Sequence, residues 1–172
     1  MKKQGFTLIE LMVVIVIMGI LAAVAVPKLF GMIAKSKASE VGPAAGTYVK
    51  LQQAFISETG SDYGNFKIIG YSAPGDKVSG GDKFDSKTTN FTYTDEGDYS
   101  EANTAALGNK TATWTAKNNV KLNDCAASTS SWTVSITKAT DGAAAADAAV
   151  FTSEVAGDGC EELTPSFSKI GS

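Results

Sequence analysis

The hydrophobic positions of this 172-residue chain follow two different patterns. From Phe6 to Val26 the sequence is one apolar run, interrupted by a single charge at Glu10. A helix needs roughly 20 apolar residues to cross the hydrocarbon core of a bilayer, and this one carboxylate lies near an end of the run. The run therefore predicts a membrane-spanning helix, and its apolar character continues as far as Ile33.

Beyond Lys35 the apolar residues become periodic. They recur at alternating spacings of three and four, which is typical of one face of an amphipathic helix. These positions are Val41, Ala44, Tyr48, Leu51 and Phe55. Glu58-Thr59-Gly60 predicts the end of this helix, with Gly60 as a left-handed cap. Gly42-Pro43 is expected to bend it, because the residue before a proline is pushed away from helical angles.

The sequence after Gly60 predicts short strands between turn residues. The segments alternate or are β-branched, and Gly, Asn, Asp and Ser lie between them. They are Phe66–Tyr71, Asn90–Thr94, Thr111–Lys117, Val120–Asn123, Trp132–Thr137 and Ala148–Ser153. Asn118-Asn119 is expected to form a tight hairpin turn. The predicted fold class is α+β, a long N-terminal helix whose C-terminal half packs against an antiparallel sheet of about four strands.

The composition argues against several classes of function. Histidine and arginine are absent, so all 15 basic residues are lysines and the chain has no imidazole base. With 18 acidic residues the net charge is −3, which argues against electrostatic binding to nucleic acid. No catalytic constellation, metal site or cofactor motif stands out, so we expect neither an enzyme nor a bound cofactor.

Two alternative roles for the apolar run stay open at this point. A buried core helix of a soluble protein would need more covering surface than a head of this size can provide. A secretory signal peptide would use Lys2 and Lys3 as its basic region and Ala23-Val24-Ala25 as its cleavage site. A signal peptide gives Glu10 no role, although a carboxylate at bilayer depth costs about 2.5–3.5 kcal/mol.

The residues around Gly5 carry a family resemblance. Gly5-Phe6-Thr7-Leu8-Ile9-Glu10, with a short basic leader before it and the apolar run after it, resembles the prepilin signal of type IV pilins and type II secretion pseudopilins. The resemblance covers about the first 35 residues. It implies a leader at 1–5, cleavage after Gly5 by a prepilin peptidase, and N-methylation of Phe6. It also implies the pilin fold, with a transmembrane and filament-core helix at 6–34 and a globular head at 35–172.

For Glu10 the resemblance implies a role in assembly. Cleavage creates an α-amino cation on Phe6 that must enter an apolar fibre core, where a carboxylate partner can offset its charge. In the family, this glutamate is thought to neutralise the terminal amine of a neighbouring subunit. The alternative is a structural glutamate at a helix N-terminus, weakly favoured by the helix dipole.

Gly19 and Pro27 are expected to weaken the second half of the span. Proline has no N–H and disrupts the hydrogen bond to residue i−4, here Ala23, while glycine adds flexibility. Similar subunits locally unwind this segment on entering the filament. The resemblance therefore implies that Gly19–Val26 is helical in the membrane and extended in the fibre. The alternative is a proline kink of the kind that membrane helices often tolerate.

The two cysteines, Cys125 and Cys160, both lie in the polar part of the chain. A head outside the membrane would keep them oxidised. Pilins that resemble this chain often close their C-terminal variable region with such a bridge, so we expect a disulfide. A metal or redox site would need closer cysteines or histidines.

The resemblance implies a structural function, namely polymerisation into a type IV pilus as a homo-oligomeric helical filament. The expected partners are the prepilin peptidase, the inner-membrane pilus assembly machinery and, before assembly, the membrane itself. No direct contact with nucleic acid is expected. The subunit is expected to be a single-pass inner-membrane protein before assembly and part of the cell-surface pilus afterwards. A type II secretion pseudopilin, and a minor pilin or adhesin at the fibre tip, are the alternatives.

Overall fold

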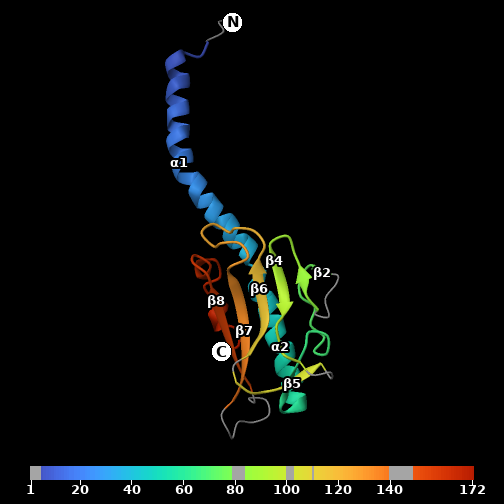
Figure 1. Ribbon diagram of the computed structural model, residues 1–172. Helices are drawn as coiled ribbons and strands as arrows, with labels where there is room; N and C mark the ends of the chain where they lie inside the picture. Colours follow the sequence, from blue (N-terminus) through green and yellow to red (C-terminus); the bar gives the residue numbers. More distant parts are fainter. Residues whose placement is uncertain (1–4, 79–83, 100–102, 110, 140–148) are drawn as a thin grey trace.

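The computed structural model describes residues 5–78, 84–99, 103–109, 111–139 and 149–172 (Figure 1). The basic part of the expected leader, residues 1–4, lies outside them. The elements follow in the order α1 (Leu8–Ala38), α2 (Val41–Thr59), β1 (Asp62–Gly64), β2 (Asp76–Lys77), β3 (Ser86–Lys87), β4 (Phe91–Asp95), β5 (Thr104–Ala106), β6 (Thr111–Asn118), β7 (Ser131–Lys138), β8 (Ala149–Ala156), η2 (Glu161–Leu163) and η3 (Phe167–Lys169). The long helix and the antiparallel sheet confirm the predicted α+β class.

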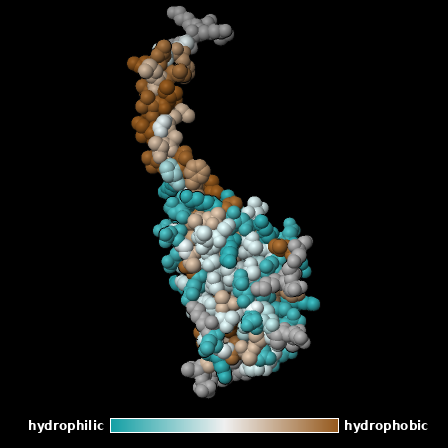
Figure 2. All heavy atoms as spheres, in the orientation of Figure 1, coloured by the Kyte–Doolittle hydropathy of each residue, from teal (hydrophilic) through white to brown (hydrophobic). Residues whose placement is uncertain are grey.

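α1 projects from the rest of the molecule, whereas α2 lies against the sheet (Figure 1). We call residues 6–33 the stem and residues 35–172 the head. The stem is exposed along its length, apart from the half-buried Gly31, and Ala34 is the first buried residue. Figure 2 shows the hydrophobic stem standing clear of a largely hydrophilic head. The sequence pattern therefore separates in space into an apolar rod and a polar body.

In place of the expected bend at Gly42-Pro43, the structure has an interruption between the two helices a few residues earlier, where Ser39 and Glu40 keep helical angles. Ser39 and Glu40 separate α1 from α2, so Pro43 lies in the first turn of α2. A first-turn proline loses no hydrogen bond within its own helix, but it cannot bond to the carbonyl of Ser39, four residues before it. The interruption therefore falls on the preceding turn. The expected end is confirmed: Gly60 has φ +79° and its N–H donates to the carbonyl of Ile56.

The main sheet has the strand order β2-β3-β4-β6-β7-β8, and all neighbours are antiparallel. Four of its strands are long, β4 with five residues and β6, β7 and β8 with eight each, which agrees with the expected sheet of about four strands. The other two, β2 and β3, have two residues each and extend one edge. Ala148, the expected start of the last strand, lies outside the described residues, and β8 begins at Ala149. β1 and β5 form a separate pair.

The predicted strand at Phe66–Tyr71 is wrong, because this segment is a compact turn. Gly70 has φ +70°, a left-handed conformation that glycine adopts without strain. This reversal lets the N–H of Tyr71 donate to the carbonyl of Phe66 at 2.8 Å. The N–H of Phe66 is held in turn by the buried carboxylate of Asp95, also at 2.8 Å. Bonds within the turn and to a distant strand replace a β ladder.

The predicted hairpin turn at Asn118-Asn119 and the strand at Val120–Asn123 are also wrong. β6 pairs with β7, so a loop of twelve residues, 119–130, joins the two strands. The buried side chain of Asn118 organises this loop, because its Nδ2 donates to the carbonyls of Val120 and Ala126 at 3.0 and 2.9 Å. An asparagine that binds the backbone two residues ahead favours a turn over a continued strand.

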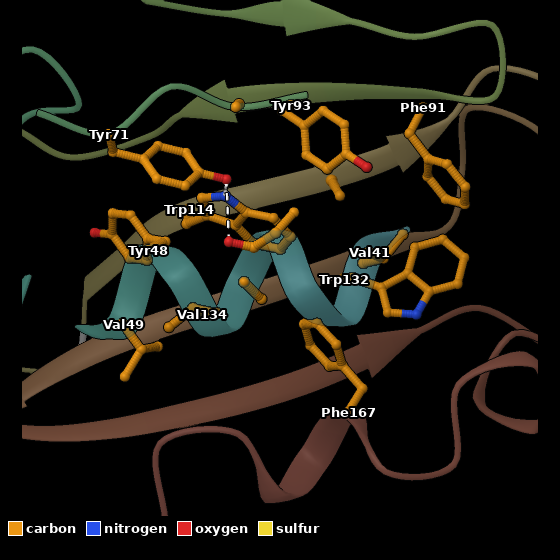
Figure 3. Packing of buried hydrophobic residues seen from close by; sticks show 14 of the residues in the cluster. Val41, Tyr48, Val49, Tyr71, Phe91, Tyr93, Trp114, Trp132, Val134 and Phe167 are labelled. Carbon is orange, nitrogen blue, oxygen red and sulfur yellow. Dashed lines mark hydrogen bonds between the residues drawn. The ribbon is translucent and has the colours of Figure 1, made fainter. Parts of the chain in front are cut away.

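Aromatic side chains fill the space between the helix and the sheet (Figure 3). The ring of Trp114 is fully buried, with its centroid 5.7 Å from Tyr93, 6.3 Å from Phe167 and 6.5 Å from Tyr48. Its indole N–H donates to the hydroxyl of Tyr71 at 3.0 Å. Residues of α2, β4, β6 and η3 thus meet around one tryptophan, which joins the C-terminal segment to the core.

Alkaline pH is expected to unfold the head. All five tyrosines have a pKa raised above the ordinary value, chiefly by burial, and they are Tyr48, Tyr63, Tyr71, Tyr93 and Tyr99. Below about pH 10 the tyrosines are neutral in both the folded and the unfolded chain, so they do not lower the free energy of unfolding there. Above it the unfolded chain releases protons that the fold retains, which lowers stability by up to about 1.4 kcal/mol per pH unit for each tyrosine.

Absorbance at 295 nm and circular dichroism, followed together during titration, test this expectation. Tyrosinate should form in the same transition that removes the near-ultraviolet circular dichroism. Ionisation of the tyrosines near pH 10 with an unchanged dichroism spectrum would contradict it.

Candidate assembly and membrane site

The stem presents large apolar side chains on every side. From Phe6 to Ile33 these side chains are 42–86% exposed. In the part of the chain that the structure describes, one helical stretch, beginning at Leu8, is long and apolar enough to cross a membrane, and none of its most apolar window is buried. The head of this chain therefore does not cover it as a core helix. A soluble surface rarely exposes so large an apolar patch, so the stem is suited to a lipid or protein environment.

Thr7 and Glu10 close the N-terminus of α1 with a capping box. The N–H of Thr7 donates to Oε2 of Glu10 at 2.8 Å, and its hydroxyl donates to the same oxygen at 2.7 Å. The N–H of Glu10 donates to Oγ1 of Thr7 at 3.3 Å. These bonds satisfy donors that every helix leaves unpaired at its start. The structural role considered for Glu10 is therefore present in the single chain.

The same geometry leaves half of the Glu10 carboxylate available. Both bonds that it accepts fall on Oε2, and the side chain is exposed. Among the described residues, Oε1 has no hydrogen-bond partner. A cation from a second chain could therefore approach Oε1 without displacing the cap. Capping and assembly do not compete for the same oxygen.

The proposed processing residues lie just outside the helix. Gly5 and Phe6 are exposed and precede the helix cap at Thr7. A Cβ placed on Gly5 would meet nothing within 4 Å. The peptide bond between Gly5 and Phe6 is therefore accessible and lies outside the helix, although cleavage and methylation there remain predictions.

The segment expected to unwind is helical in the single chain. α1 continues through Gly19–Val26, and Pro27 lies inside it. Figure 1 shows the helix bending partway along its length. A Cβ at Gly19 would meet nothing within 4 Å, so packing within this chain does not require glycine there. An extended form of the segment in a filament remains a prediction.

A disulfide joins Cys125 to Cys160, as expected, with their Cα atoms 4.7 Å apart. Both cysteines are fully buried. The bridge ties the loop between β6 and β7 to the start of η2, and η2 lies against α1. The C-terminal segment is thus fixed near the junction of stem and head. Among the described residues, no group of three or more Cys, Asp or Glu side chains is arranged to hold a metal ion.

One residue that positions the stem could not be found from the sequence pattern. Glu40 lies between α1 and α2 and is half-buried. Its Oε1 accepts hydrogen bonds from the hydroxyls of Thr88 at 2.7 Å and Tyr93 at 3.2 Å. These bonds link the helix interruption to the sheet across 48 and 53 positions of sequence. A single glutamate before Val41 carries no local signal of such partners.

Glu40→Gln is expected to lower the free energy of unfolding by about 1–2 kcal/mol. The amide oxygen can still accept the two bonds, but hydrogen bonds to a charged group are roughly twice as strong as neutral ones. Urea unfolding of the full-length protein in detergent measures the change. Glu58→Gln is the matched control, because Glu58 is exposed on α2. Equal loss in both variants would show that the contacts of Glu40 add nothing.

Comparison with known proteins agrees with this arrangement. The prokaryotic N-terminal methylation motif matches residues 1–26. The chain is 44% identical over 66 residues to the type IV major pilin protein PilA of Myxococcus xanthus, covering 37% of this chain and 30% of that protein. It is 48% identical over 62 residues to the fimbrial protein EcpC of Eikenella corrodens, covering 36% and 38%.

A third relative is the type IV major fimbrial protein FimA of Dichelobacter nodosus, 52% identical over 44 residues, covering 26% of this chain and 28% of that protein. These matches span only about a third of the relatives' lengths. No solved structure matches the chain significantly. The methylation motif, the relatives named as major pilins or fimbrial proteins, and the long helix packed on an antiparallel sheet together support a type IV pilin.

Proposed function

We propose that this chain is a structural subunit of a type IV pilus, polymerised through its stem with its head outside. The observation that carries the proposal is the exposed apolar stem, which begins at Phe6 directly after Gly5 and has one carboxylate at Glu10. Such a surface has two suitable environments, the bilayer before assembly and the packed helices of a fibre afterwards. The proposed role is structural and assigns no catalytic residue.

Processing would prepare the subunit for assembly. A prepilin peptidase cleaves after Gly5, which removes the leader 1–5, and the new terminus at Phe6 is N-methylated. The resulting cation enters the apolar core of the filament, where Oε1 of Glu10 on a neighbouring subunit pairs with it. An unpaired charge in such a core is expensive, so the pairing favours insertion at the correct register.

The proposed location follows from the length of the stem. Phe6–Val26 contains 21 residues, which at about 1.5 Å per residue matches the roughly 30 Å hydrocarbon core of a bilayer. Before assembly the subunit is a single-pass protein of the inner membrane, where the assembly machinery extracts it into the homo-oligomeric fibre. On entry Gly19–Val26 unwinds next to Pro27, since proline and glycine lower the cost of breaking the helix there.

Two related functions compete with this proposal. A type II secretion pseudopilin would share the leader and the stem, and a minor pilin or adhesin would sit at the fibre tip. The names of the relatives, which are major pilins and fimbrial proteins, favour a major pilus subunit. The disulfide-closed C-terminal region supports the same choice over a pseudopilin. Abundance of the chain in sheared filaments separates a major subunit from a tip protein.

The intact mass and N-terminal sequence of the protein from sheared surface material test the proposal. We expect a chain that begins at methylated Phe6 and is two hydrogens lighter than its reduced form. A chain that begins just after Ala25 would instead identify an ordinary signal peptide. That result would leave an exported head without a stem and would overturn the filament role.

A further inference from the structure

A groove of about 390 Å³ lies beside the junction of α1 and α2. Its helix side is lined by Ala38, Ser39 and Gly42, and its other side by residues 163–167 and Ile170 of the C-terminal segment. The described residues that line it are mostly apolar, and none of them is charged. Because the helix side begins a few residues beyond the stem, the groove extends the apolar surface of the stem into the head.

The hydroxyl groups of this groove are largely engaged already. Oγ of Ser39 donates to the carbonyl of Ser36 at 2.7 Å, and Oγ1 of Thr164 accepts from the indole N–H of Trp132 at 2.6 Å. Among the described residues of the lining, Ser166 has the one hydroxyl without a hydrogen bond. Sites for small molecules use several convergent polar groups to fix the orientation of the ligand. The groove is therefore better suited to apolar protein side chains than to a polar small molecule.

The distance of the groove from the bilayer argues against a lipid as its occupant. Ala38 is twelve residues beyond Val26, the end of the proposed span, which is about 18 Å along a helix. The headgroup layer is only about 5–8 Å thick on each side of a bilayer. An acyl chain would have to leave the membrane to reach the groove. The stem of a second chain has the same apolar chemistry and reaches this level once both chains are in a fibre.

The stem carries a matching ridge on its opposite side. Leu29 and Ile33 are four residues apart, so they lie on one face of α1, and they are 55% and 42% exposed. The interruption between the helices keeps helical angles. At about 100° per residue, the ridge therefore points about 140–180° away from Ala38 and Gly42 around the helix axis. Ridge and groove of one chain cannot meet, so each can meet only the other surface of a second copy.

A contact between ridge and groove would propagate. An interface between two different surfaces of the same chain leaves both surfaces free at the ends, so it builds an open filament unless the rotation closes a ring. Two parallel stems offset by nine residues, about 14 Å, bring the ridge level with Ala38 and Gly42. A Cβ on Gly42 would meet nothing within 4 Å, so packing within this chain does not require glycine there. Small residues do let a second helix approach closely.

The charges beside the two surfaces are complementary. Glu161 and Glu162 are exposed next to the groove, in a segment after β8 that carries three carboxylates and one lysine. On the ridge side, Ile33, Lys37 and Lys121 line one depression of the surface. In the part of the chain that the structure describes, the side chains of these two glutamates and two lysines form no ion pair or hydrogen bond. Opposite charges at the rim of a contact fix its orientation and disfavour wrong partners.

We propose that the groove at the helix junction is the seat of a neighbouring subunit's stem, whose Leu29 and Ile33 fill it. The lysines that flank this ridge then face the carboxylates beside the groove. The inference rests on the proposed polymerisation through the stem and adds the surface of the head that receives it. It gives a role to an uncharged groove on a head whose surface is otherwise largely hydrophilic (Figure 2).

Crosslinking in assembled filaments tests this contact. Ser166→Cys places a reactive thiol at the exposed rim of the groove, while both native cysteines are held in the buried disulfide. Sheared filaments are labelled with benzophenone maleimide, irradiated and digested with trypsin. We expect a dimer on denaturing gels and a crosslink to the tryptic peptide 29–35, which contains the ridge. Ser57→Cys, about 22 Å beyond Gly42 along α2, is the matched control and should not label that peptide.

Charge reversal decides the question independently of the added cysteine. Glu161→Lys/Glu162→Lys should reduce sheared filaments about tenfold or more, because it places like charges opposite each other. Lys37→Glu/Lys121→Glu should have the same effect, and all four substitutions together should restore filaments to near wild-type amounts. Immunoblots of whole cells show whether the subunit itself is present. Glu58→Lys is the matched control, because Glu58 is exposed on α2, and it should assemble normally.

Several results would overturn the inference. Normal filaments without a crosslink from residue 166 to peptide 29–35 would show that the groove does not seat a stem. Normal assembly of both charge-reversed pairs, or no rescue when they are combined, would show that these charges do not face each other. A crosslink to a different protein would make the groove a site for that partner. By contrast, wild-type protein without a stem in sheared material would overturn the proposed function itself.

Discussion

Glu10→Gln is expected to be exported and cleaved normally but to reduce surface filaments about tenfold or more. The substitution replaces the carboxylate that would face the methylated amine of Phe6 in a neighbouring subunit. A buried amine without a charged partner costs several kcal/mol, and each 1.4 kcal/mol is a factor of ten in an equilibrium constant. Immunoblots of sheared filaments and of whole cells measure assembly and total subunit separately.

The capping box makes this substitution selective. Glutamine can also reach back to the N–H of Thr7, so the start of α1 should remain closed while the charge is removed. Thr7→Ala is the matched control, because it removes the hydroxyl from the cap and keeps the carboxylate. Loss of an N-cap side chain costs about 1 kcal/mol, so we expect this control to assemble.

The two variants separate the roles of Glu10. Poor assembly of Glu10→Gln with good assembly of Thr7→Ala supports charge pairing. Poor assembly of Thr7→Ala alone would mean that the cap matters and that the charge does not. Normal piliation in Glu10→Gln would remove the pairing argument altogether.

The stem could be predicted from the sequence because its signal is local. A 21-residue apolar run, one early carboxylate and a glycine just before the run are all read from adjacent positions. The left-handed cap at Gly60 was predictable for the same reason. Where one residue and its neighbours decide the conformation, pattern and structure agree.

The head was less predictable because distant residues decide its local structure. Phe66–Tyr71 has the composition of a strand, yet Asp95 holds the N–H of Phe66 from 29 residues away. The sequence of the segment itself does not reveal a hydrogen bond to such a distant partner. β-propensity reflects packing on a half-buried surface, and this surface was not available to the segment.

The same reasoning accounts for the parts of the site that the sequence did not reveal. Gly5, Phe6 and Glu10 belong to one short motif, so the sequence named them together. The bonds of Glu40 join positions far apart in the chain. Only the tertiary arrangement brings these partners together.

Replacing both cysteines, Cys125→Ser/Cys160→Ser, is expected to lower the free energy of unfolding by about 4 kcal/mol. The bridge closes a loop of about 36 residues, and chain entropy in the unfolded state gives this magnitude for a loop of that length. Urea unfolding of the full-length protein in detergent measures it. Replacing both residues avoids a free thiol that could pair with another chain.

Loss of the disulfide should first destabilise the C-terminal segment that the bridge holds. Phe167 packs with its ring centroid 6.3 Å from Trp114, and the indole N–H of Trp132 donates to the hydroxyl of Thr164 at 2.6 Å. Without the bridge, only noncovalent contacts such as these, and the hydrogen bond from the hydroxyl of Ser153 to the carbonyl of Ile170 at 2.8 Å, hold the segment after residue 160 on the core. We therefore expect faster proteolysis there and a red shift of tryptophan fluorescence at urea concentrations that leave the wild type folded.

Reduction of the wild type supplies the matched control for this double variant. If the stabilisation comes from the covalent link, reduced wild type and the double serine variant should unfold at similar urea concentrations. A stable reduced protein beside an unstable double variant would instead point to the packing of the sulfur atoms in the core. An unchanged midpoint in both would mean that packing around Trp114 and Trp132 suffices to hold the C-terminal segment, and that the bridge does not stabilise the head.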